Sequence, residues 1–147
     1  MAVDVITSTI IARPCVDVAA YASNPDNALH WYENIKSVRW VTEPPLRVGT
    51  RLAFVAHFLG RELTYTYEVS EVVPDRRFVM HTAEGPFPME TSYEWETVES
   101  NSTRMTLRNR GAPSGFSAVF APFMTWAMRR ANVKDLATLR TILEGAP

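Results

Sequence analysis

The chain has 147 residues, enough for one domain that removes roughly 68 to 70% of its unfolded-chain surface from water. Its formal net charge of −1 gives no excess of positive charge to displace counterions from a nucleic-acid backbone, so we expect no nucleic-acid partner. Cys15 is the only cysteine, which excludes an internal disulfide and a cysteine-based zinc cage.

The N-terminal part is predicted to hold one strand followed by two short helices. Residues 3–12 are rich in Val, Ile and Thr and contain no turn former, which is typical of a strand. Pro14 suits the first turn of a helix that ends near residue 21, and Asn24-Pro25 suits the start of a second helix that ends near residue 32. The start of the chain does not have the pattern of a secretion signal, and no stretch of about 18 apolar residues occurs, so we expect a cytoplasmic protein without a transmembrane segment.

The middle of the chain alternates apolar and polar residues with a period of two, which predicts strands. The predicted strands span residues 38–43, 50–58, 61–73, 76–83, 88–98 and 103–110. They are separated by the turn sequences Pro44-Pro45, Leu59-Gly60, Pro74-Asp75, Gly85-Pro86 and the polar run 99–102. Links this short favour antiparallel neighbours.

After the breaker sequence 111–115, apolar residues recur at helical intervals up to Gly145. We expect a long C-terminal helix that starts or kinks at Pro122. The predicted order is a strand, two short helices, six strands and a long helix, in a single domain spanning residues 1–147. This order indicates an α+β architecture in which a curved seven-stranded antiparallel sheet surrounds the helix and leaves a concave pocket.

Alternation along the six later strands separates an apolar, aromatic face from a charged one. The apolar face consists of Leu52, Phe54, Ala56, Phe58, Leu63, Tyr65, Tyr67, Val69, Phe78, Met80, Thr82, Met89, Thr91, Tyr93, Trp95, Met105, Leu107 and Asn109. The C-terminal helix is expected to cover it with Phe116, Phe120, Phe123, Met124 and Met128. Methionines on such surfaces either adapt to varied apolar ligands or fill gaps in a core, and both interpretations remain open.

The polar groups on the apolar face are three phenols, one indole, the hydroxyls of Thr82 and Thr91, and the amide of Asn109. Buried Tyr65, Tyr67, Tyr93 and Trp95 need hydrogen-bond partners, which are waters, the backbone, Asn109 or the oxygen atoms of a ligand. We expect no acidic side chain in the middle of this face. The sequence shows no paired carboxylates, metal-binding histidine spacing, nucleophile motif or phosphate loop, so no catalytic residue, metal site or cofactor is predicted.

Several stretches of the chain carry a likeness to known proteins. They are IARPCVDVAAYASNPDNALHW, VGTRL, FLGRELTYTYEVSEVVPDRRFVM, GPFPMETSYEW, STRMTL and VKDLATLRTILEG, which together span essentially the whole chain. The chain resembles the START-like superfamily, also called SRPBCC or birch-pollen-allergen-like, in its polyketide cyclase/dehydrase-like branch. The resemblance implies a helix-grip fold with a cavity. It also suggests places near the cavity mouth for Trp31 and Trp40, with a structural plug as the alternative.

Two functions remain open. The leading hypothesis is binding of a hydrophobic small molecule, whether lipid, aromatic or polyketide-like, between the sheet and the C-terminal helix of a monomer or weak homodimer. The expected ligand-binding residues are Trp40, Phe54, Tyr65, Tyr67, Met80, Met89, Tyr93, Trp95, Asn109, Phe120 and Met124. The alternative is a polyketide cyclase or dehydratase-type enzyme in which Tyr67, Tyr93 and Asn109 act on the substrate.

Overall fold

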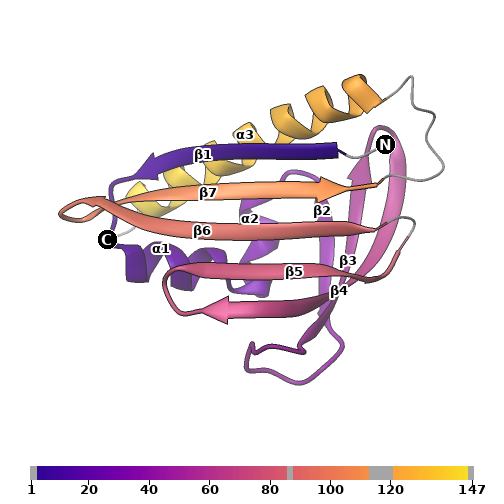
Figure 1. Cartoon of the computed structure of the whole chain (residues 1–147), viewed down its shortest axis with the longest axis horizontal. Coiled ribbons are helices and arrows are strands. Elements are labelled where there is room, and N and C mark those ends of the chain that lie inside the picture. The colour runs from indigo at the N-terminus through magenta and orange to yellow at the C-terminus, as the bar shows by residue number, and fades with distance from the viewer. Residues whose placement is uncertain (1–2, 86–87, 113–120, 146–147) are drawn as a thin grey trace.

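The computed structural model describes residues 3–85, 88–112 and 121–145, and it contains one curved sheet with helices along one face (Figure 1). The elements in chain order are β1 (Val3–Ile11), α1 (Cys15–Ala22), the 3₁₀ helix η1 (Pro25–Asn27), α2 (Ala28–Trp31), β2 (Ile35–Trp40), β3 (Arg51–Phe58), β4 (Arg61–Val73), β5 (Arg77–Glu84), β6 (Met89–Glu99), β7 (Ser102–Gly111) and α3 (Ala121–Gly145). The predicted α+β architecture is confirmed.

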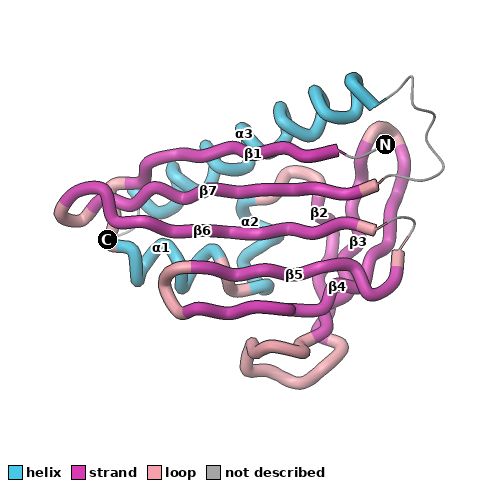
Figure 2. Tube along the Cα trace, viewed as in Figure 1, coloured by secondary structure: helices cyan, strands magenta, loops and turns pink. Residues whose placement is uncertain are grey.

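The seven strands form a single antiparallel sheet with the order β1-β7-β6-β5-β4-β3-β2 (Figure 2). Strands β2 to β7 are therefore a meander, and β1 joins it beside the last strand. The long helix α3 packs against β1, so the first strand and the last described helix lie along the same edge of the sheet.

Two predicted elements differ from the structure in their bounds. The second short helix, expected over residues 24–32, divides into η1 and α2. The strand expected over residues 38–43 is β2, which begins at Ile35 and ends at Trp40. An irregularity between Ile35 and Ser37 interrupts its pairing with β3, and a bulge of this kind breaks the period-two pattern by which a strand is recognised.

The turns between the long strands contain residues with positive φ. At the β3–β4 turn, Leu59 and Gly60 have φ of 52° and 76°, which is the requirement of a type I′ hairpin turn. Asp75 and Asn101, at the next and the last hairpin, have φ of 62° and 64°. Asp and Asn tolerate this conformation better than other residues with a side chain.

The predicted division of the sheet into two faces is confirmed. Inward residues such as Leu52, Tyr67 and Leu107 are buried. The outer face carries cross-strand ion pairs, including Arg51–Glu68, Arg104–Glu96 and Arg110–Glu90. Two outward residues, Val79 and Ser92, are nevertheless buried; they lie opposite each other on β5 and β6.

The described part of helix α3 runs from Ala121 to Gly145 and buries Met124, Leu136, Leu139 and Leu143. Phe123 was expected to cover the sheet, but 51% of it is exposed. This prediction is wrong because adjacent helical residues point about 100° apart, and Met124 is the one that faces the core. Phe116 and Phe120 lie outside the described residues. Within the described ranges, no helix is long and apolar enough to cross a membrane.

Candidate functional site

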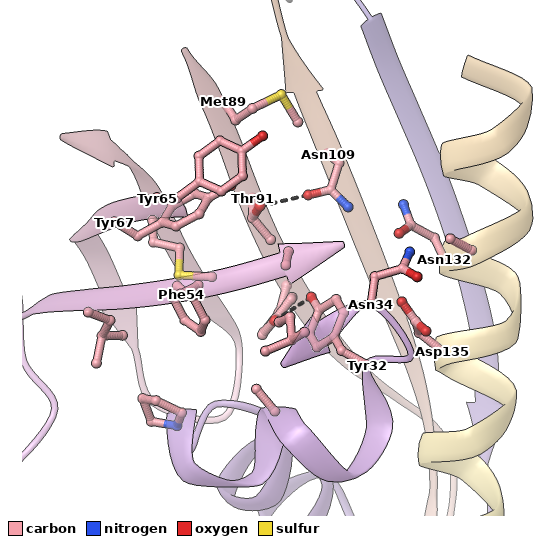
Figure 3. A pocket seen from close by; sticks show the side chains of 18 of the residues that line it. Tyr32, Asn34, Phe54, Tyr65, Tyr67, Met89, Thr91, Asn109, Asn132 and Asp135 are labelled. Carbon is pink, nitrogen blue, oxygen red and sulfur yellow. Dashed lines mark hydrogen bonds between the residues drawn. The ribbon is translucent and has the colours of Figure 1, made fainter. Parts of the chain in front are cut away.

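A cavity of about 160 Å³ lies between the concave face of the sheet, the short helices and α3 (Figure 3). Of the residues predicted to bind a ligand, the structure places Phe54, Tyr65, Tyr67, Met80, Met89, Tyr93 and Asn109 on its wall. Other wall residues are Ala22, Ser23, Asn24, Pro25, Ala28, Tyr32, Asn34, Ile35, Leu52, Ala56, Phe58, Leu63, Phe78, Thr91, Met128, Ala131, Asn132 and Asp135.

The structure places three other predicted residues away from the cavity wall. Trp95 points inward, but it lies further along β6, against Tyr93, and its indole N–H has no hydrogen-bond partner among the described residues. Met124 is buried in the core. Trp40 is half-buried, and its indole N–H donates to Asp26 Oδ1 at 2.9 Å. Phe120 lies outside the described residues.

Trp31 packs between the short helices and the sheet, which was the alternative to a place near the cavity mouth. Its side chain is 1% exposed and belongs to the core cluster rather than to the cavity wall. The indole ring lies 4.1 Å from the ring of Tyr32 and 5.7 Å from that of Tyr93. Trp31 therefore packs α2 against β6 and supports the two phenols in front of it.

One side of the cavity is aromatic and apolar. Tyr67 packs edge-to-face on Phe54 at 5.6 Å and lies 5.8 Å from the ring of Tyr65. A Cβ atom at Gly85 would lie 2.7 Å from Tyr65 Cδ1, so the absence of a side chain there makes room for the ring. Burial raises the pKa of Tyr67 to about 12, although a hydrogen bond with Thr91 opposes the shift. These phenols stay uncharged at neutral pH.

A pair of hydroxyl groups joins the short helices to the sheet. The hydroxyl oxygens of Tyr32 and Tyr93 lie 2.6 Å apart and share a hydrogen bond. Burial raises the pKa of both phenols. Beside them, the Thr91 hydroxyl donates to Asn109 Oδ1 at 2.6 Å. The hydrogen-bond partner that Tyr93 was expected to need is thus another tyrosine, from the end of α2.

The opposite side of the cavity is polar and comes from α3. Asn132 and Asp135 are three residues apart, so they share one face of the helix, and they are 4% and 2% exposed. Figure 3 shows both side chains directed into the cavity, together with Asn34 from the segment before β2. The Nδ2 atom of Asn132 is buried without a hydrogen-bond partner in the described part of the chain.

Asp135 is a buried carboxyl group held by the backbone of the segment after α2. The Glu33 N–H donates to Asp135 Oδ1 at 3.0 Å. Burial raises the pKa of Asp135 to about 7, and the negative charge of Glu33 adds to this rise. The Glu33 hydrogen bond and the positive charge of Lys134 act in the opposite direction. The carboxyl group therefore exchanges its proton near neutral pH.

Sequence reasoning missed the polar side of the cavity. It searched the strands for acidic residues, and the described strands indeed place none among the cavity-lining residues. The expectation covered the strand face alone, and Asp135 reaches the cavity from α3 instead. A signal was present: Asn132 and Asp135 have the same helical phase as the buried Met124, Leu136 and Leu139, so they had to face inward as well.

Comparison with known proteins identifies the family and the fold. The chain matches the family model described as polyketide cyclase / dehydrase and lipid transport over residues 2–144. A solved structure from Thermus thermophilus is similar with a TM-score of 0.82 and 19% identity, and the match covers 97% of this chain and 99% of that one. A comparison with curated proteins finds no match.

Two further solved structures are similar to this chain in fold. The Zhui aromatase/cyclase from Streptomyces sp. R1128 matches with a TM-score of 0.82 and 15% identity, over 98% of this chain and 94% of that one. A START superfamily protein from Mycobacterium smegmatis matches with a TM-score of 0.73 and 14% identity, over 97% and 94%. These confirm the START-like fold that the sequence resembles. Because the family model spans nearly the whole sequence, the chain belongs to the polyketide cyclase / dehydrase and lipid transport family.

Proposed function

We propose that this protein binds an apolar small molecule in the cavity between the sheet and α3. The observation that carries the proposal is a cavity of about 160 Å³ with a predominantly apolar and aromatic wall. An apolar protein cavity of roughly 150 Å³ is large enough to take up benzene. The ligand class supported by this size is a molecule that inserts one or two rings, or a short apolar chain.

Apolar burial alone gives only modest affinity. A ring system that hides about 200 Å² gains about 5 kcal/mol before the cost of association, at about 25 cal/mol per Å². Micromolar affinity requires about 8 kcal/mol after that cost. A ligand that binds this tightly therefore needs more apolar area or polar contacts with the cavity wall.

The test is to fill the cavity without removing any native contact. Ala131 lies on the wall, whereas Ala137 is exposed on the same helix, so Ala131→Phe and Ala137→Phe are a matched pair. We expect Ala131→Phe to weaken binding of 2-methylnaphthalene by about tenfold or more, and Ala137→Phe to leave it unchanged. Equilibrium dialysis measures the affinity. Equal affinity in all three proteins would contradict the proposal.

Native mass spectrometry of the protein as purified complements this experiment. A retained lipid or aromatic compound would identify the ligand class directly. Its release from Ala131→Phe, but not from Ala137→Phe, would locate the compound in the cavity.

A second function, a polyketide cyclase or dehydratase-type enzyme, is favoured by Asp135. A buried carboxyl group with a pKa near 7 is suited to accept and return a proton at neutral pH. The uncharged phenols of Tyr67 and Tyr93 and the amide of Asn109 would donate hydrogen bonds to carbonyl oxygens as enolates develop. The similar fold of an aromatase/cyclase supports testing this chemistry.

The two functions separate in one experiment with a poly-β-ketone substrate analogue. Enzymatic action predicts that Asp135→Asn and Tyr93→Phe abolish turnover while binding of the analogue survives. If the unmodified protein binds the analogue and leaves it unchanged, the enzyme hypothesis is refuted and binding remains.

A further inference from the structure

The part of the cavity wall that the structure describes carries no positively charged side chain. Among the described residues that line it there is no Lys, Arg or His, and the one carboxyl group is that of Asp135. Its tyrosines are neutral phenols, because burial raises the pKa of Tyr67 and Tyr93. A buried anionic ligand would thus have no counterion on this wall, and an unpaired buried charge is strongly unfavourable.

The polar side of the cavity contains a donor that lacks an acceptor. Asn132 is 4% exposed, and its Nδ2 atom has no hydrogen-bond partner in the described residues. Most buried donors in proteins are paired. The side chain is directed into the cavity (Figure 3), so an acceptor atom of a ligand would provide the missing partner.

An acceptor lies on the same helical face, three residues further on. The Asp135 carboxyl group is 2% exposed, and the donor that the structure shows for it is the Glu33 N–H on Oδ1. The charged groups around it are Glu33 and Lys134, which pair with each other at 3.5 Å, and the phenols facing it are Tyr32 and Tyr93. With a pKa of about 7, Asp135 carries its negative charge above neutral pH.

These two groups set opposite requirements for one ligand head group. A carboxylate has only acceptors, so it would pair with Asn132 but face the charge of Asp135. An ammonium group has only donors, so it would suit Asp135 but leave Asn132 unpaired. A hydroxyl or carboxamide group has both a donor and an acceptor, and it therefore satisfies both side chains without a net charge.

We propose that the cavity selects an uncharged apolar ligand whose head group both accepts a hydrogen bond from Asn132 and donates one to Asp135, such as a phenol, alcohol or carboxamide. The inference rests on the proposed binding function and adds the chemical class of the ligand. Fatty acids and other carboxylates bind less tightly than such ligands above neutral pH. The apolar part of the ligand lies against Phe54, Tyr65 and Met80 on the other side of the cavity.

The test uses naphthalenes that differ only in their substituent: 2-naphthol, 2-naphthamide, 2-naphthoate, 2-naphthylmethylammonium and 2-methylnaphthalene. At about pH 8 we expect 2-naphthol and 2-naphthamide to bind about tenfold more tightly than the other three. The discrimination against 2-naphthoate is expected to shrink at about pH 5.5, because Asp135 is then protonated. Equilibrium dialysis reports all five affinities on one scale.

Two cavity variants and one control assign the selectivity to its residues. Asp135→Asn keeps the shape and is expected to raise the affinity for 2-naphthoate at about pH 8 by about tenfold. Asn132→Leu is expected to reduce the preference for 2-naphthol over 2-methylnaphthalene to less than about threefold. Glu96→Gln removes one negative charge from the exposed outer face. It is expected to change neither the affinity for 2-naphthoate nor the preference for 2-naphthol over 2-methylnaphthalene. Binding of 2-methylnaphthalene shows that each variant still forms the cavity.

The outcomes separate the ligand class from the binding function. If the five probes bind equally and Ala131→Phe weakens them all, the inference about the head group is overturned and the binding function stands. Tighter binding of 2-naphthoate than of 2-naphthol would also overturn it. If no probe binds to the unmodified protein, both the inference and the proposed function fail.

Discussion

The buried Asp135 predicts that the protein loses stability as the pH rises from acid to neutral. The ordinary pKa of an aspartate is 3.8, and in the folded protein it is raised to about 7. Below about pH 4 the carboxyl group is protonated in both states and contributes no pH dependence. Between the two values the unfolded chain releases this proton and the folded chain retains it, so unfolding becomes more favourable. Above about pH 7 both states are ionised and the effect levels off.

The magnitude follows from the size of the shift. About three pKa units at about 1.4 kcal/mol each give a full effect of about 4 kcal/mol. Between about pH 5 and pH 8 the free energy of unfolding is expected to fall by between about 2 and 3 kcal/mol because of this carboxyl group. Asp135→Asn removes the ionisable group and retains an acceptor for the Glu33 N–H. The free energy of unfolding of the variant should therefore rise by the same amount relative to that of the unmodified protein between about pH 5 and pH 8.

Urea unfolding of both proteins at several pH values measures the effect. The difference in the free energy of unfolding between Asp135→Asn and the unmodified protein is expected to grow from about pH 5 to pH 8 and then remain constant. Glu96→Gln, on the outer face, controls for the loss of one negative charge. A difference that does not change with pH would refute the reasoning, since it would mean that Asp135 ionises as easily in the fold as in the unfolded chain.

Four further substitutions test three other features of the fold, each by chemical unfolding. Tyr93→Phe leaves the hydroxyl of Tyr32 without its partner and should lower the free energy of unfolding by about 1 to 3 kcal/mol. Tyr32→Phe should lower it less in the Tyr93→Phe background than alone; equal losses would show that the hydrogen bond contributes nothing to stability. Gly85→Ala places a Cβ atom against Tyr65, so it should lower the free energy of unfolding by about 1 to 3 kcal/mol and alter the affinity for 2-methylnaphthalene. An unchanged free energy of unfolding would show that the ring of Tyr65 moves freely. Leu59→Asn should stabilise the β3–β4 turn by about 0.5 to 1 kcal/mol, because Asn accepts a φ of 52° more readily; a loss of stability would contradict this.

The strand part of the cavity could be predicted from the sequence because strand geometry leaves only two choices for each side chain. Once Leu63, Tyr65 and Tyr67 were assigned to one face, their neighbours on the paired strands followed by counting in twos. The structure places these residues on the cavity wall. Trp95 faces inward as alternation predicts, but it does not line the cavity. Alternation gives the direction of a side chain and not its distance from the cavity along the strand.

The hydrogen bonds on the polar side of the cavity could not be predicted in this way. Tyr32 meets Tyr93 across 61 positions of sequence, and the Glu33 N–H meets Asp135 across 102. Such contacts depend on how α2 and α3 pack on the sheet, which no local pattern encodes. The phase of α3 was also misjudged at Phe123, because the apolar residues near its start do not all belong to the buried stripe.

The pairing of β1 with β7 has a consequence for how the chain reaches its native state. Each of the other adjacent strand pairs joins neighbours in sequence, but this ladder matches Val3 with Gly111 and Ile11 with Thr103. The Ala12 N–H and the Arg13 guanidinium then donate to Glu144 and to the Leu143 carbonyl at the end of α3. Closure of so long a loop is entropically costly and slows folding. The strand wall of the cavity therefore stays open to solvent until β1 has paired with β7 and α3 has packed against β1.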